Sequence, residues 1–307
     1  MIQLDSTPSV ALGLWPLAGI TTVGVTNEDA EATITAAINA GITTFDTAFS
    51  YGYQGESDRL LGRFIKSERD RYCIIGKVGQ RWTNDRQRVI DAHPTTITND
   101  AETSLKRMGI ESLDLLMLHS PDPEIPIEES AASLCRMVQQ GRCRSIGVCN
   151  VQLEQFLAFH KAVRAESIPC DAIQVPLNLL QQESLQTIIP NCYKLGTHTD
   201  VYWTLMKGLL AGKISRDHEF APGDSRPSYE IFRGEARARA HDVVDALETL
   251  GREVNRTTAQ LAVGWTLSQR GVRHALVGAR RPEQVKEIAG STPLSNEVLF
   301  RIDDILR

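Results

Sequence analysis

Short apolar runs alternate with helix-forming segments along the whole chain, and this alternation limits the fold more than any other feature. The runs lack strict polar alternation, which is typical of parallel strands covered on both faces. Each is short enough for one strand and is followed by a longer segment with helical periodicity. We therefore expect eight strands, at residues 10–14, 42–46, 72–78, 113–118, 145–149, 172–175, 199–203 and 273–277.

Helix signals lie between these runs. Thr26 and Asp29 have the spacing of a capping box, and Pro94 and Pro126 stand where a first helical turn begins. Further helices are expected over residues 151–165, 183–189, 236–250, 258–269 and 282–289. Eight strand-helix units without a break in composition predict an α/β protein, a (β/α)8 TIM barrel that forms a single domain over residues 1–307. The doubly wound alternative lacks a Gly-x-Gly-x-x-Gly after the first strand.

Composition excludes several other classes of protein. The chain has 33 Lys plus Arg against 38 Asp plus Glu, a net charge of −5, which argues against nucleic-acid binding. We expect no membrane span, and residues 1–10 lack the build of a secretion signal. Six cysteines without a Cys-x-x-Cys pair indicate reduced thiols and a cytoplasmic protein, and the scattered histidines predict no metal site. No interface helix is evident, so we expect a monomer.

Four titratable residues fall where three neighbouring strands end or just after. Asp46 ends the second strand, Lys77 the third and His119 the fourth, while Tyr51 follows in the loop after Asp46. The active site of a TIM barrel lies at this end of its strands. We expect Asp46 to pair with Lys77, and the Lys77 ammonium to lower the pKa of the Tyr51 phenol below its usual value of about 10. Such a set suits protonation of a carbonyl oxygen while its carbon receives a hydride.

Several motifs, in order, resemble the aldo-keto reductase superfamily. Residues 45–52 read Phe-Asp-Thr-Ala-Phe-Ser-Tyr-Gly and are followed by Gly-Glu-Ser-Asp at 55–58. Residues 115–122 read Leu-Leu-Met-Leu-His-Ser-Pro-Asp, and residues 141–150 read Gly-Arg-Cys-Arg-Ser-Ile-Gly-Val-Cys-Asn. The similarity extends from about residue 12 to residue 289. It implies a catalytic tetrad of Asp46, Tyr51, Lys77 and His119, with Tyr51 as the general acid in reduction.

The resemblance also implies a nicotinamide cofactor. Asn150 and Gln174 match the groups that hold the nicotinamide carboxamide in that family, and Trp203 stands where the family has an aromatic ring against the nicotinamide. The loop after the seventh strand would line the pyrophosphate through backbone N–H groups and one lysine. The residues expected there are Leu205, Gly208, Leu210, Gly212 and Lys213.

The adenosine end is expected after the eighth strand. Gly278 and the pair Arg280-Arg281 run directly into a helix start, and helix N-termini and arginines both attract phosphate. The resemblance assigns Arg280 and Gln284 to the 2′-phosphate and adenine, with Glu287 beside them. We therefore expect NADP(H) as the cofactor, with NADPH favoured over NADH.

The chain departs from the family pattern at four places. Cys149 replaces the usual serine before the asparagine, and a thiol is a weaker hydrogen-bond partner. Ile288 replaces an asparagine after the last glutamate, and Val277 replaces a proline. The usual aromatic-Ser-Pro-Leu run is read as Trp-Thr-Leu-Met at residues 203–206.

The leading functional hypothesis is an NADPH-dependent reductase of aldehydes and ketones, which in reverse oxidises the matching alcohol or sugar. Trp15, Phe49 and Trp82, with the long loop at about residues 205–234, are expected to form the walls of the substrate pocket. Two alternatives remain open. One is a barrel lyase that uses Lys77 as a Schiff-base nucleophile. The other is a cofactor-binding regulatory or sensor protein with little turnover.

Overall fold

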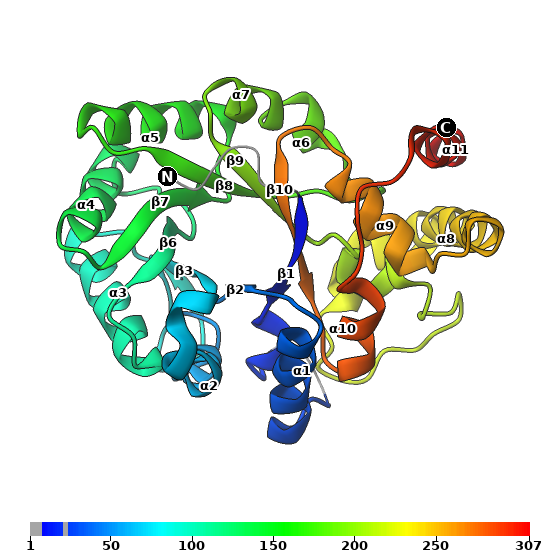
Figure 1. Cartoon of the computed structure of the whole chain (residues 1–307), viewed down its shortest axis with the longest axis horizontal. Helices are drawn as coiled ribbons and strands as arrows, with labels where there is room; N and C mark the ends of the chain where they lie inside the picture. Colours follow the sequence, from blue (N-terminus) through cyan, green and yellow to red (C-terminus); the bar gives the residue numbers. More distant parts are fainter. Residues whose placement is uncertain (1–7, 21–23) are drawn as a thin grey trace.

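A closed barrel of eight parallel strands forms the centre of the computed structural model, which describes residues 8–20 and 24–307 (Figure 1). The barrel closes because β1 pairs with both β2 and β10. The predicted α/β TIM-barrel fold is confirmed, and the predicted strands agree with the observed ones to within a few residues. The barrel strands are β1 (Ser9–Gly13), β2 (Thr44–Asp46), β3 (Cys73–Val78), β6 (Leu113–Leu118), β7 (Cys143–Cys149), β8 (Cys170–Pro176), β9 (His198–Tyr202) and β10 (Val272–Gly278).

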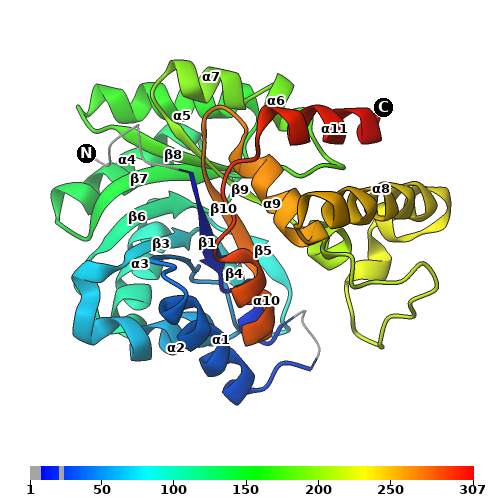
Figure 2. The ribbon, with the colours of Figure 1, turned by 45° about the vertical axis from the view of Figure 1, so that its right-hand side comes forward.

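Helices cover the outside of the barrel, and α8 and the C-terminal α11 extend beyond this layer on one side (Figure 2). The capping box is present, since Thr26 accepts from the Asp29 backbone N–H and the Asp29 carboxylate accepts from the Thr26 N–H. We did not anticipate α2 or α11. The helices are α1 (Asn27–Asn39), α2 (Glu56–Ile65), α3 (Pro94–Met108), α4 (Ile127–Gln139), α5 (Leu153–Ala165), α6 (Glu183–Gln186), α7 (Ile189–Lys194), α8 (Gly234–Val254), α9 (Thr258–Leu267), α10 (Pro282–Ile288) and α11 (Asn296–Leu306).

A small β-hairpin is inserted between β3 and α3. Its strands, β4 (Gln80–Trp82) and β5 (Arg88–Ile90), pair antiparallel, with Trp82 opposite Arg88. The stretch 205–234, expected to be irregular, holds three short 3-10 turns, at Met206–Ala211, Arg226–Ser228 and Glu230–Phe232. Both segments follow barrel strands at their C-terminal ends, so they border the predicted active-site face.

The interior of the barrel combines a small apolar cluster with buried charge. Ile75, Leu115, Met117 and Ala172 form the cluster. Gly147 belongs to the same wall, and a Cβ there would lie 2.2 Å from the Ala172 carbonyl oxygen, so only glycine fits between β7 and β8. The rest of the hydrophobic core lies between the strands and the helices.

A buried ion pair joins β9 to β10. Arg273 donates to both carboxylate oxygens of Asp200, at 3.1 and 2.8 Å, and Nδ1 of His274 lies 2.9 Å from the same carboxylate. The Arg273 guanidinium and the neighbouring His274 hold the pKa of Asp200 well below its usual range, although burial acts in the opposite direction. This carboxylate is therefore charged inside the barrel.

All six cysteines lie in the described part of the chain and are free thiols, five of them buried. No helix in residues 8–20 and 24–307 has both the length and the apolar character needed to cross a bilayer. Most of the N-terminal segment tested for a secretion signal, residues 1–7, lies outside the described residues.

Candidate active site

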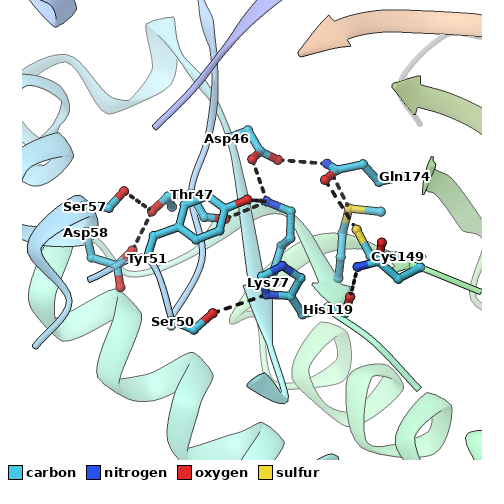
Figure 3. Close-up of polar contacts among 12 residues, drawn as sticks. Asp46, Thr47, Ser50, Tyr51, Ser57, Asp58, Lys77, His119, Cys149 and Gln174 are labelled. Carbon is cyan, nitrogen blue, oxygen red and sulfur yellow. Dashed lines mark hydrogen bonds and ion pairs between the residues drawn. The ribbon is translucent and has the colours of Figure 1, made fainter. Parts of the chain in front are cut away.

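Lys77 is the centre of a buried polar cluster at the C-terminal ends of the strands (Figure 3). Its ammonium donates to the Asp46 carboxylate at 2.6 Å, to the Thr47 carbonyl at 3.0 Å and to the Tyr51 hydroxyl at 3.3 Å. Lys77 and Asp46 are almost completely shielded from solvent. The expected pairing of Asp46 with Lys77 is thus present, and the phenol shares the same ammonium.

His119 lies next to Tyr51 (Figure 3). The ring centroids are 5.8 Å apart in an edge-to-face arrangement, and the Ser50 hydroxyl lies 3.5 Å from Nδ1 of His119. The backbone N–H of His119 donates to Val78, which ties the residue to the end of β3. The structure therefore brings the four predicted residues together around one space.

Backbone hydrogen bonds fix the loop that carries Tyr51. Thr47 donates its N–H to Ile75, and Phe49 donates its N–H to Lys77. The Thr47 hydroxyl donates to the Asp58 carboxylate at 2.8 Å, which anchors the loop to the start of α2. Burial raises the pKa of Asp58 to about 6. Sequence reasoning gave Asp58 no role, although it lies in the quoted Gly-Glu-Ser-Asp motif.

The pKa of the Tyr51 phenol differs from the expected one. Burial raises the pKa of Tyr51 to about 12, and the Lys77 ammonium offsets this only in part. The prediction of a lowered pKa is therefore wrong for the site as described, because desolvation outweighs the nearby positive charge. The consequence is that the phenol keeps its proton at neutral pH.

Lys77 and His119 have opposite protonation states at neutral pH. Burial alone would lower the pKa of Lys77, but the Asp46 carboxylate and the Tyr51 phenol outweigh it, and the pKa is raised. Burial, followed by the charges of Lys77 and Arg88, lowers the pKa of His119 well below its usual value. The site thus contains a charged ammonium beside a neutral imidazole.

Two amide side chains lie beside the cluster, on β8 and after β7. Gln174 donates to Asp46 at 2.9 Å and accepts from the Cys149 thiol at 3.4 Å. Asn150, with a positive φ of 56°, donates to the His119 carbonyl at 2.8 Å. The structure therefore places both amides next to the four clustered residues.

Tyr202 also belongs to the site, although the sequence analysis did not predict it. Its hydroxyl donates to the Asn150 side-chain carbonyl at 2.6 Å. Trp203 follows the end of β9 with a φ of 59° and packs edge-on against Tyr202, with ring centroids 5.4 Å apart. The signal was present, because reading the aromatic-Ser-Pro-Leu run as Tyr202-Trp203-Thr204-Leu205 preserves its leucine.

Several backbone N–H groups of the loop after β9 donate to carbonyl groups of the same loop. The N–H groups of Gly208 and Leu210 both donate to the Leu205 carbonyl, and that of Gly212 donates to Leu209. These groups, which we expected to line a pyrophosphate, are therefore occupied within the loop. Lys213 lies 4.0 Å from the Glu287 carboxylate.

The start of α10 has a second arginine nearby that the sequence did not suggest, Arg226, which is itself paired with Asp224. Gln284 accepts from the Arg280 N–H at 2.8 Å, which places them together at the start of α10. Arg281 points elsewhere and pairs with Asp29 at 2.6 Å. Burial and then the charge of Arg226 lower the pKa of Arg280, so Arg226 of the long loop lies near it. Because Arg226 and Arg280 are far apart in the sequence, the sequence analysis did not predict that they lie near each other.

Glu287 and Gly278 are the remaining residues predicted for this part of the site. One carboxylate oxygen of Glu287 is buried and accepts no hydrogen bond. A Cβ at Gly278 would lie 2.6 Å from Pro16, so the glycine permits the chain to turn close to the loop after β1. The buried oxygen leaves an acceptor for a ligand's donor.

The predicted pocket walls divide into two groups. Trp15 packs edge-on against Tyr51 with centroids 5.1 Å apart, and the Trp82 indole donates to the Ser50 carbonyl at 2.8 Å. Both rings border the catalytic loop. Phe49 instead stacks between the guanidinium groups of Arg81 and Arg107. Phe49 and Trp82 both line a neighbouring cavity of about 310 Å³.

Comparisons with known proteins agree with this geometry. The model of the Aldo/keto reductase family matches residues 9–307. The chain is 33% identical over 303 residues to aldo-keto reductase YhdN of Bacillus subtilis, covering 97% of this chain and 89% of the relative. It is 30% identical to an NADH-specific methylglyoxal reductase of Escherichia coli, covering 83% and 80% of the two chains.

Solved structures extend the agreement to three dimensions. A glycerol dehydrogenase from Gluconobacter oxydans matches with a TM-score of 0.88 and 32% identity, covering all of this chain and 94% of the other. An aldo/keto reductase from Klebsiella pneumoniae in complex with NADP and acetate shares the fold, with a TM-score of 0.75, 22% identity and coverage of 98% and 92%. The strand order, the clustered polar residues and the family match lead to one conclusion: this chain is an oxidoreductase of the aldo/keto reductase family.

Proposed function

We propose that this protein reduces aldehydes or ketones with NADPH and, in reverse, oxidises the matching alcohols or sugars. The observation that carries the proposal is the contact between the protonated Tyr51 hydroxyl and the buried Lys77 ammonium. A general acid in carbonyl reduction needs a proton to give and a charge that stabilises the resulting anion. Tyr51 supplies the first and Lys77 the second.

The carbonyl oxygen is expected to lie between Tyr51 and His119. Neutral His119 donates one hydrogen bond to it, and Tyr51 gives its proton as the negative charge develops. A reduced nicotinamide, when bound, supplies the hydride for the carbonyl carbon. Asp46 holds Lys77 in place and keeps it charged through the 2.6 Å contact.

The choice of NADPH rests on the adenosine end. Arg280 offers positive charge beside the start of α10, where a phosphate is favoured, and Arg226 lies nearby although Asp224 already pairs with it. Asn150 and Gln174 fit a carboxamide, with Tyr202 or Trp203 as the aromatic neighbour of the nicotinamide. The Glu287 oxygen that accepts no hydrogen bond suits the adenine amino group.

The lyase alternative fits the site poorly. A Schiff-base lysine must be neutral to attack a carbonyl. Lys77 is instead held charged by Asp46, and its raised pKa opposes loss of the proton.

The test measures oxidation of NADPH and of NADH with a panel of aldehydes, for the wild type, Tyr51→Phe and Arg280→Ala. We expect Tyr51→Phe to lose about 10²–10⁴-fold in kcat while it still binds NADPH. Arg280→Ala should weaken NADPH binding and leave NADH binding unchanged. Tight NADPH binding by the wild type without turnover would instead indicate the sensor alternative, and full activity of Tyr51→Phe would exclude the proposed acid.

A further inference from the structure

Arg88 lies at the mouth of the active site, on the hairpin that follows β3. Its guanidinium carbon is 5.5 Å from the centroid of the Trp15 ring and 6.0 Å from that of Trp82. Trp15 in turn packs against Tyr51. One indole ring therefore separates the guanidinium from the phenol that we propose as the acid.

Hydrogen bonds hold this guanidinium in one orientation. Arg88 donates to the side-chain carbonyl of buried Gln80, and the Gln80 amide donates to the Ser120 hydroxyl at 2.5 Å. Ser120 also accepts from Asn150 at 3.3 Å. The hairpin is thus tied to the expected carboxamide site, so Arg88 is preorganised with respect to the reacting groups.

The charge of Arg88 has no carboxylate partner among residues 8–20 and 24–307. Arg81 on the same hairpin differs, since it pairs with Asp100 at 2.9 Å. Burial lowers the pKa of Arg88, and the phenols of Tyr51 and Tyr229 are the groups that oppose this. Arg88 also acts electrostatically on His119. An exposed cation without a carboxylate partner in the described part of the chain therefore lies one indole ring away from Tyr51.

We propose that Arg88 binds an anionic group on the substrate, a carboxylate or a phosphate ester, while the carbonyl lies against Tyr51 and His119. Arg88 gives one N–H of its guanidinium to Gln80, and its other N–H groups can donate to the oxygens of such a group. Because an indole ring separates Arg88 from Tyr51, the anionic group and the carbonyl are several bonds apart. The inference deepens the proposed function and rests on it.

Matched substrates test this assignment. The wild type and Arg88→Met are compared on 4-oxobutanoate and on butanal, which lacks its carboxylate, and on glyceraldehyde 3-phosphate and glyceraldehyde. We expect Arg88→Met to lose about 10–100-fold in kcat/KM for an anionic substrate and less than about 3-fold for its neutral partner, as for a charged hydrogen bond. Whichever pair shows the loss identifies the anion as carboxylate or phosphate.

Two further variants separate binding from folding. Arg86 lies on the same hairpin, with its guanidinium over Tyr53, so Arg86→Met is expected to leave all four substrates unchanged. Arg88→Lys keeps the charge without the planar fork and should recover part of the preference. An equal loss for anionic and neutral substrates in Arg88→Met would overturn the proposal.

Failure of the proposed function has a different signature. If the wild type reduces neutral aldehydes but prefers no anionic one, Arg88 has no such role and the reductase proposal stands. If no aldehyde is reduced, binding of succinate and of inorganic phosphate is measured by tryptophan fluorescence. Binding that Arg88→Met abolishes would support the anion site without the reductase, and no binding would overturn it.

Discussion

Two buried ion pairs lie inside the same barrel, and their surroundings differ. Arg273 and Asp200 are 3% and 0% exposed, and the guanidinium contacts both oxygens of the carboxylate. Lys77 and Asp46 are buried to the same degree, yet they share one contact at 2.6 Å. Lys77 uses another contact for Tyr51, and Asp46 uses its second oxygen for Gln174.

From this difference we infer that the buried Arg273–Asp200 pair serves stability and that the buried Lys77–Asp46 pair serves reactivity. The carboxylate oxygens of Asp200 contact only groups of β10 among the hydrogen bonds described above, so the Arg273–Asp200 pair joins neighbouring strands. The Lys77 pair instead contacts a titratable phenol and an amide that we assign to cofactor binding. Buried pairs contribute little net stability when intact but are costly to break, so each pair can be examined by removing one partner.

The largest effect is expected for Lys77→Met. The variant removes the charge that stabilises the Tyr51 anion, and kcat for aldehyde reduction should fall about 10²–10⁴-fold. Thermal unfolding should change much less, because without Lys77 the buried Asp46 carboxyl can take up a proton and become neutral, the form that burial favours. A variant that keeps wild-type kcat would show that Lys77 is structural, like Arg273.

Arg273→Met is expected to have the reverse result. Removing the guanidinium leaves the buried Asp200 carboxylate with only the His274 ring as its partner, which should cost about 3–5 kcal/mol in the free energy of unfolding. The kcat of the folded fraction should remain near that of the wild type. In the matched control Arg273→Met/Asp200→Asn, most of the loss should be recovered in urea unfolding, and equal losses in both would contradict the ion-pair argument.

A smaller effect is expected on the pH dependence of folding stability, which tests the same contrast between the two ion pairs. The pKa of Asp200 is depressed in the folded state, so its contribution to stability is complete well above the unfolded value of about 3.9 and is lost as the pH falls through and below that value. The wild type should therefore lose stability below about pH 4 more steeply than Arg273→Met/Asp200→Asn. Parallel curves in urea unfolding at pH 3–6 would mean that Asp200 does not set this dependence.

Cys149→Ser should have the smallest effect. The thiol donates to Gln174 at 3.4 Å, and a hydroxyl can make the same contact with a stronger hydrogen bond. We expect the KM for NADPH to change by less than about 3-fold and the melting temperature to stay within a few degrees. A larger change in KM would place Cys149 in direct contact with the cofactor.

Much of the catalytic cluster was predictable because strand ends are visible in the sequence. Asp46, Lys77 and His119 each follow or end an apolar run, and a barrel brings such ends to one face. The order of neighbouring strands then places them close together. Tyr51 was predictable only as a loop residue in the same motif.

Other features depend on distance and burial that no local pattern records. The raised pKa of Tyr51 reflects desolvation by residues from several strands. Arg226 and Arg280 are far apart in sequence and meet only because the long loop returns to α10. The strands of the β4–β5 hairpin have three residues each, too few to show an alternating pattern. Trp203 was taken for the residue that ends the seventh strand, which is Tyr202.

The position of the β4–β5 hairpin has a consequence for how this enzyme can diversify. β3 pairs directly with β6, so the hairpin takes no part in closing the barrel. If Arg88 binds the substrate as we propose, this residue can be replaced by an aromatic or an acid without any change in the strand order. Substrate preference would then be encoded on the hairpin and proton transfer on the barrel strands and the Tyr51 loop, so that selection could act on one without changing the other.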